Sequence, residues 1–225
     1  MKKLIPAICM TLIAAVMLAS STFAWFSMNT QVTATGMQVT AKTDNAYLII
    51  SNGTNLTGKA TSADASVNTS LYPVKPVGGL TSENIGTVTS WGIATSSNPD
   101  DANTGAVVTP LGTGATYANY VAKVSFMVGI VEDSGVVAND LKLAGLTISD
   151  LNDGITVVVV CGANLYSHNA NVASGIEKLA DAASVTKTGV QVDVYIYIDG
   201  SNENVKTTNA ANLGGSVTLT FSIAA

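Results

Sequence analysis

The chain has 225 residues, of which 47% are hydrophobic and only 11% are charged, and its net charge is −5. All ten basic residues are Lys, so no guanidinium group is present to clamp a phosphate or carboxylate, and the acidic balance opposes binding to a nucleic-acid backbone. We therefore expect no nucleic-acid partner. The apolar content is too high for a disordered acidic chain and predicts a buried core.

The first 24 residues have the pattern of a secretory signal peptide. Lys2 and Lys3 form the positive region, Leu4–Ala19 is an uncharged and almost entirely apolar run, and Thr22-Phe23-Ala24 has small residues at positions −3 and −1 for cleavage after Ala24. The alternative is an uncleaved anchor over Leu4–Phe26, which is just long enough to span a bilayer. We expect a signal peptide over 1–24, a membrane contact only during export, and a secreted protein at the cell surface or in the extracellular matrix.

Cleavage would leave residues 25–225 with Cys161 as the one thiol, so no intramolecular disulfide could form and the core alone would stabilise the fold. We interpret 25–225 as a single domain. Several stretches of this part favour β-strands weakly, because they are rich in β-prone residues but alternate imperfectly. They are Gln31–Ala41, Ala46–Ser51, Leu71–Val77, Leu141–Ile148 and Asn164–His168.

Stronger strand signals come from strict alternation of apolar and polar residues. The segments Val124–Ile130, Val190–Ile198 and Val217–Ile223 each place apolar side chains on one face, which predicts strands with one buried face. Ile155–Cys161 is apolar almost throughout, which predicts a strand that is covered on both faces or lies centrally in a sheet. Helix is expected only as two turns over Ser174–Ala183 and one turn near Ser82-Glu83-Asn84.

About nine short strands separated by turn residues predict an all-β fold, an antiparallel two-sheet sandwich of jelly-roll type with long loops. Two stretches rich in Ser, Thr, Asn and Gly, namely Ser51–Ser70 and Ser90–Gly114, are interpreted as surface excursions where binding could be added.

The residues that usually carry catalysis form no recognisable constellation. His168 is the single imidazole and has no nucleophile motif beside it, so we interpret it as a surface or hydrogen-bonded residue. Cys161 ends the most hydrophobic strand and is interpreted as an inert buried thiol. The zinc-peptidase motif His-Glu-x-x-His is absent. Paired carboxylates of a glycosidase stay open without positive support, and we expect no enzyme.

Calcium is the one metal that the composition allows. Oxygen-bearing side chains gather at Asn98–Asn103, at Asn152-Asp153 and at Asp199–Asn204. None of the three has the spacing of an EF-hand loop, so we interpret them as turn residues and expect no cofactor.

The junction after the leader resembles a known family. The stretch Thr22–Asn29, followed by Thr33–Val39, resembles the start of exported proteins of the TasA/camelysin family, which are processed by a SipW-type signal peptidase. Val194–Asn204 and the last strand, Val217–Ile223, resemble the end of the same family. The resemblance covers about a third of the chain. It implies a secreted jelly-roll sandwich whose subunits form biofilm-matrix fibres when an N-terminal strand of one subunit completes a sheet of the next.

The N-terminal segment itself makes strand exchange physically reasonable. It begins with Trp25-Phe26-Ser27-Met28 and continues as an uncharged, β-prone stretch over Thr30–Ala41. A free sheet edge can accept such a segment from a neighbour. Burying the large apolar side chains would remove several hundred Å² from water, worth roughly 10 kcal/mol before the costs of association. The predicted donor-strand residues are Trp25, Phe26, Met28, Val32, Met37 and Val39.

The partner of this strand is expected to be a second copy of the chain, because a head-to-tail contact need not close and so yields open filaments. The alternative is that residues 25–41 pair within their own sandwich and the protein is a monomer. A different function also stays open, a cell-surface adhesin or carbohydrate-binding module that recognises a matrix or host-surface ligand. Its aromatic candidates are Trp91, Tyr117, Tyr120 and Tyr166, although Trp91 also suits a core position.

Overall fold

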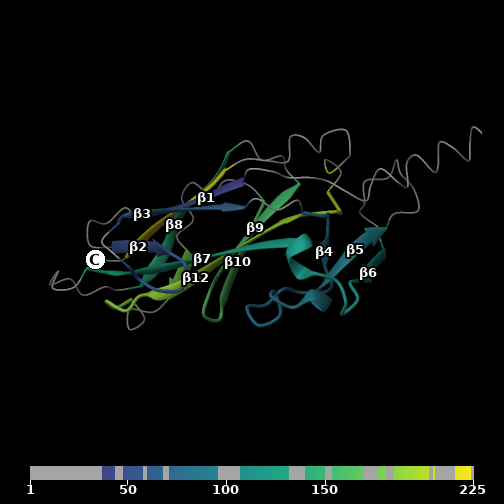
Figure 1. Cartoon of the computed structure of the whole chain (residues 1–225), viewed down its shortest axis with the longest axis horizontal. Helices are drawn as coiled ribbons and strands as arrows, with labels where there is room; N and C mark the ends of the chain where they lie inside the picture. Colours follow the sequence, from purple (N-terminus) through teal and green to yellow (C-terminus); the bar gives the residue numbers. More distant parts are fainter. Residues whose placement is uncertain are drawn as a thin grey trace, which may run out of the picture.

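The structure is a computed structural model, and it confirms the all-β class. It describes residues 37–43, 48–57, 60–67, 71–95, 107–131, 140–149, 154–169, 177–180, 185–202, 205 and 216–223. Within these ranges there are thirteen strands in three sheets, two short 3₁₀ helices and no α-helix. Two five-stranded sheets pack face to face as a sandwich, and the small third sheet lies at one end (Figure 1).

Sheet A has the strand order β11-β8-β13-β1-β3. Its strands are β11 (Glu177–Ala180), β8 (Leu141–Ser149), β13 (Ser216–Ile223), β1 (Met37–Thr43) and β3 (Ser62–Val67). Neighbouring strands are antiparallel with one exception, because β1 runs parallel to β13.

Sheet B has the strand order β10-β9-β12-β7-β2, and every pair in it is antiparallel. Its strands are β10 (Asn164–His168), β9 (Ile155–Cys161), β12 (Val190–Ile198), β7 (Val121–Ile130) and β2 (Leu48–Asn52). Three strand pairs, each within one sheet, are nested along the chain, so that each pair encloses the next in sequence. β7 pairs with β12, β8 with β11, and β9 with β10.

The main core lies between sheets A and B and comes from the alternation seen in the sequence. In β13 every second residue is buried, and the buried set faces the inner residues of β12 and β7. Val, Leu and Ile side chains dominate the layer, which fills the space between two sheets about 10 Å apart. Its large, fully buried members include Phe126, Phe221, Leu48, Ile50, Leu71, Leu141, Leu143, Leu146 and Ile155.

A second apolar layer covers the outer face of sheet B. It is built by the segment between β3 and β7, which carries β4 (Lys75–Pro76), η1 (Val88–Ser90), β5 (Trp91–Thr95), β6 (Val107–Pro110) and η2 (Tyr117–Asn119). We call the described part of this segment, residues 71–95 and 107–120, the cap. Trp91 is its fully buried centre, and it contacts Tyr197 edge-on with ring centroids 4.7 Å apart.

Because the cap covers the outer face of sheet B, two expectations from the sequence are wrong. Ser90–Gly114 is not only a surface excursion, because it supplies the buried Trp91 and two strands of the third sheet. The prediction of one buried face for Val190–Ile198 is also wrong, since Tyr195 and Tyr197 on the second face are each only 5% exposed. It is wrong for Val124–Ile130 as well, because Met127 on the second face of that strand is buried. A tyrosine in the polar half of an alternating pattern can be covered when its ring packs and its hydroxyl is satisfied.

Two further expectations are wrong because the segments pair with strands elsewhere in the chain. The predicted helix over Ser174–Ala183 is replaced in its described part by strand β11, which pairs with the edge of sheet A at β8. Ser51–Ser70 contains β3, which pairs along its length with β1. Tertiary pairing overrides weak local preferences in such short segments. The single turn expected near Ser82-Glu83-Asn84 is present as hydrogen-bonded turns over 82–86.

The strong strand predictions are confirmed in position. Val190–Ile198 coincides with β12, and Ile155–Cys161 coincides with β9, in which all seven residues are buried. Val217–Ile223 and Val124–Ile130 lie within β13 and β7. Of the weaker predictions, Asn164–His168 coincides with β10, Leu141–Ile148 lies within β8 and Ala46–Ser51 overlaps β2. Leu71–Val77 shrinks to the two residues of β4, and the described part of Gln31–Ala41, residues 37–41, lies in β1.

Replacing the cap's central side chain should destabilise the whole fold. We expect Trp91→Ala to lower the free energy of unfolding by about 3–5 kcal/mol, because it leaves a cavity against Tyr197 and removes the indole N–H bond to the Ile85 carbonyl. Ile93→Ala is the matched control, since Ile93 lies two residues along the same strand and is 45% exposed. Urea unfolding measures both, and equal losses would contradict a buried role for Trp91.

Candidate functional site

The described end of the predicted assembly strand, residues 37–41, lies inside sheet A. Strand β1 lies between β13 and β3 and forms six residue pairs with each, from Gln38↔Ser216 to Thr43↔Phe221 on one side and from Met37↔Val67 to Lys42↔Ser62 on the other. It is therefore bonded along both edges by its own chain.

The side chains of β1 explain why the segment takes this place. Val39 and Ala41 are fully buried in the main core, whereas Gln38 is exposed, which is the period-two alternation of a strand with one buried face. On the outer face the Thr40 hydroxyl donates a 2.7 Å hydrogen bond to Asp64 Oδ1 across the pair with β3. Cross-strand pairs of this kind fix the register of a sheet.

The two ends of β1 lie at opposite ends of the sandwich. Ser216, which pairs with Gln38, also pairs with Ser149, from which the chain returns through a short connection to Ile155. Ile155 pairs with Ile198, whose carbonyl accepts a hydrogen bond from Val74 of the cap. The chain thus enters β1 at the cap end, whereas β13 finishes at the opposite end, where the C-terminus is marked in Figure 1.

The predicted donor-strand residues divide into two groups. Trp25, Phe26, Met28 and Val32 lie outside the described residues. Met37 is the first residue of β1, and Val39 is a fully buried member of the core. The structure of one chain does not test exchange between chains, so the assembly role of these residues stays a prediction.

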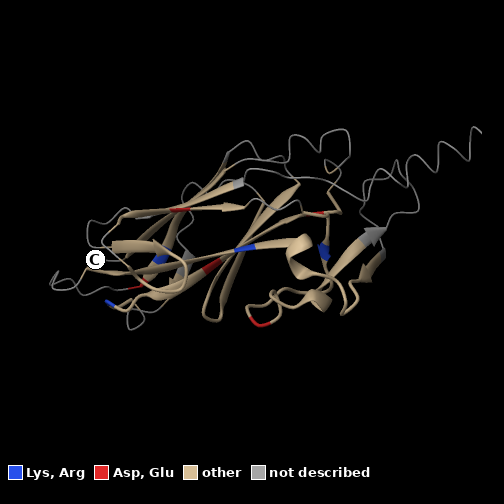
Figure 2. Ribbon diagram, viewed as in Figure 1, with Lys and Arg blue, Asp and Glu red and all other residues tan. Residues whose placement is uncertain are grey.

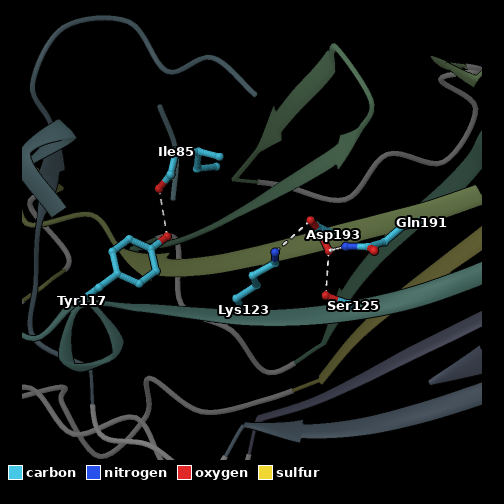
Figure 3. Close-up of polar contacts among 6 residues, drawn as sticks. All are labelled: Ile85, Tyr117, Lys123, Ser125, Gln191 and Asp193. Carbon is cyan, nitrogen blue, oxygen red and sulfur yellow. Dashed lines mark hydrogen bonds and ion pairs between the residues drawn. The ribbon is translucent and has the colours of Figure 1, made fainter. Parts of the chain in front are cut away.

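A polar cluster lies on the outer face of sheet B (Figure 3). Asp193 of β12 accepts hydrogen bonds at Oδ1 from Ser125 Oγ (2.6 Å) and Gln191 Nε2 (2.8 Å), and its Oδ2 lies 2.9 Å from Lys123 Nζ. The ammonium group also sits 5.4 Å from the ring centroid of Tyr195. Because β7 and β12 are paired in register at Ser125↔Asp193, adjacent strands bring these groups together.

The electrostatics of the cluster are those of a satisfied surface ion pair. Partial burial by itself would lower the pKa of Lys123, but the hydrogen bond and the negative charge of Asp193 outweigh it, and the pKa of Lys123 is raised. The Lys123 side chain is 42% exposed, so solvent screens the attraction. Both carboxylate oxygens of Asp193 are engaged, Oδ1 by Ser125 and Gln191 and Oδ2 by Lys123.

Charges elsewhere are sparse. Figure 2 shows the charged residues of the described strands as isolated segments, with no block of one sign. Among the described residues no group of three or more His, Cys, Asp or Glu side chains could hold a metal ion. At Asp199 the carboxylate accepts bonds from the backbone N–H and the hydroxyl of Ser201, which is turn chemistry. Asn98–Asn103, Asn152-Asp153, Glu203 and Asn204 lie outside the described residues.

The aromatic residues considered for ligand binding have structural roles. The Trp91 indole and the Tyr117 hydroxyl both donate to the Ile85 carbonyl, at 3.0 and 2.9 Å. Trp91 is fully buried and presents no ring face to a sugar. Tyr120 packs against Tyr72 with ring centroids 5.7 Å apart, and the partly buried Tyr166 packs against the main core.

The remaining reactive candidates also lie in ordinary environments. Cys161 ends β9 and is 2% exposed, and burial raises the pKa of its thiol to about 11, so it is protonated at neutral pH. This confirms the interpretation of a buried thiol. His168 ends β10 and is partly buried.

Neither the cap nor the polar cluster is predicted by the sequence patterns alone. A signal for the cluster was available, because Asp193 and Tyr195 share the second face of β12 and an acidic residue in a long apolar strand needs a partner. The partner itself, Lys123, lies one residue before the predicted strand over Val124–Ile130. Only the pairing register of β7 with β12 reveals the contact.

Comparisons with protein-family models, with curated proteins and with solved structures found no match. In the described part of the chain, no helix has the length and apolar character needed to cross a membrane.

The Lys123–Asp193 pair should contribute little stability. A double-mutant cycle with Lys123→Met and Asp193→Asn, measured by urea unfolding, is expected to give a coupling of about 0.2–1 kcal/mol that shrinks as salt is added. A coupling above about 2 kcal/mol that salt does not change would instead indicate a desolvated pair.

Stability should fall at alkaline pH because buried acids must ionise. Burial raises the pKa of Cys161 to about 11 and that of Tyr197 to about 12, so the folded chain holds protons that the unfolded chain releases above about pH 9. The contribution of Cys161 is present below pH 9 and is lost as pH rises, by about 2 kcal/mol at pH 11.

Urea unfolding from pH 8 to 11.5 checks this, with Cys161→Ala as the comparison. The variant keeps the tyrosines and should show a shallower decline between pH 9 and 11. Parallel curves for the two proteins would show that the thiol does not contribute.

Proposed function

We propose that the chain is a secreted structural protein, a subunit of an extracellular fibre or biofilm matrix, and that its subunits join head-to-tail by β-augmentation. One observation carries the proposal. Residues 25–36, an uncharged segment that begins with Trp25 and Phe26, lead into a strand that is built into the core and that starts at the end of the sandwich opposite the C-terminal end of β13. The resemblance of both chain ends to the TasA/camelysin family supports the same function.

We also propose that the sandwich is of the jelly-roll type. The nested ladders β9–β10, β8–β11 and β7–β12 support this, because a jelly roll is a long hairpin rolled into two sheets. With β13 and β1 added, the strands form two rows of four, β1-β13-β8-β11 and β7-β12-β9-β10, and β2 and β3 extend the edges. Strand β1 occupies the place of the first strand, although it runs parallel to the last.

The geometry favours residues 25–36 over β1 as the exchanged element. If β1 itself moved to a neighbour, the connection from Thr43 to Leu48 would have to cross between subunits, and it can span only about 17 Å. Removing β1 would also uncover β13 and β3 and empty the positions of Val39 and Ala41. The segment before Met37 can reach about 40 Å from the cap end without disturbing its own sheet.

In this arrangement the predicted residues have two roles. Trp25, Phe26, Met28 and Val32 would make the contact with the neighbouring subunit. Met37 and Val39 would anchor the segment in its own subunit, because they belong to β1. The joint would be heterologous, so it would extend into a filament rather than close into a dimer.

Three N-terminal truncations test the proposal by electron microscopy and size exclusion. The chain 25–225 is expected to assemble into filaments or oligomer ladders. The chain 37–225, which keeps β1, is expected to be a folded monomer with the urea midpoint of the assembling protein at low concentration. The chain 43–225 loses β1 and is expected to unfold or aggregate, because its core is open.

Substitutions separate an apolar contact from a general need for the segment. Trp25→Ser with Phe26→Ser is expected to abolish assembly, whereas Asn29→Ser with Thr30→Ser, in the same segment, is expected to preserve it. Filaments formed by the chain 37–225 would overturn the proposed joint, and a monomeric chain 25–225 would overturn the fibre function.

A further inference from the structure

Strand β1 is bonded on both sides in a way that suits it to carry force. Its six pairs with β13 and six with β3 leave no free edge, and the side chains of Val39 and Ala41 are held in the core at 0% exposure. A strand in the interior of a sheet can leave only by breaking two ladders and withdrawing its buried side chains.

The direction of β1 decides how a pull would act on these ladders. The chain enters β1 at the cap end, next to Ser216, and β13 finishes at the opposite end, beyond the pair Thr43↔Phe221. A force that pulls the N-terminal segment away from the far end of the sandwich therefore acts along the strand axes. Such a force loads all the pairs between β1 and β13 at the same time, in shear. If both strands were instead pulled at the same end, the pairs would break one after another.

We propose that β1 is a mechanical clamp, which transmits tension from the segment before Met37 into the body of the sandwich. The shear geometry follows from the parallel pairing of β1 with β13. An antiparallel first strand would begin beside the C-terminal end of β13, and a pull on these two neighbouring ends would separate the strands pair by pair. This function rests on the proposed fibre in one respect, because the fibre supplies the tension. The resistance itself is a property of the single subunit.

Single-molecule force spectroscopy tests the clamp on residues 25–225, which contain every described element. One handle is placed on residue 25. The other is placed on a cysteine introduced by Ser222→Cys, for shear, or by Ser216→Cys, for peeling, both in a Cys161→Ala background. Ser216 and Ser222 are matched, because both are half-buried outward residues of β13, one at each end.

The unfolding force is expected to be several-fold higher with the handle at residue 222 than at residue 216, although the two variants have the same free energy of unfolding in urea. Forced unfolding reports the unfolding barrier along the pulling direction, so equal chemical stability isolates geometry. Equal forces for the two positions would overturn the clamp. Because the measurement uses single molecules, a high shear force in a chain that forms no filaments would keep the clamp and reject the fibre.

Discussion

The structure depends on one strand whose residues are all buried. All seven residues of β9, from Ile155 to Cys161, are buried, so both faces of sheet B must be covered. Sheet A covers one face and the cap covers the other, with Val157 and Val159 in the first layer and Val158 and Val160 in the second. The excursion between β3 and β7 is thus a requirement of the core, since without it the strand would expose alternate valines.

The sequence predicted well those strands in which alternation and burial agree. β13 and β9 follow directly from their patterns, one with a single buried face and the other with two. The prediction of secondary structure failed where a segment forms a strand only because it pairs with another strand. β11 carries the helix-like run Glu177–Ala180 but completes the edge of sheet A at β8, and the short β3 gains its place from pairing with β1. Such pairings join distant residues and leave no local signal.

The features of the candidate site also depend on pairing between distant residues. The proposed function would use backbone pairing and apolar side chains, which no short sequence motif encodes. The uncharged segment before Met37 was recognisable from the sequence, but its attachment to an interior strand was not, because that depends on the register with Ser216. The polar cluster at Asp193 was missed for the same reason, since its cation comes from the neighbouring strand.

The pairing of β1 with β13 also affects how the chain can fold. β1 is the first described strand and β13 the last, so sheet A cannot be completed until nearly the whole chain is present. Contacts between such distant residues form slowly, and until β13 takes its place between β8 and β1 the core beneath that place is exposed. In the secreted fibre subunit that we propose, the amino-terminal part would emerge first and wait for the last strand. Completion of the subunit would then be tied to the end of its own translocation, which would delay assembly until the chain has left the cell.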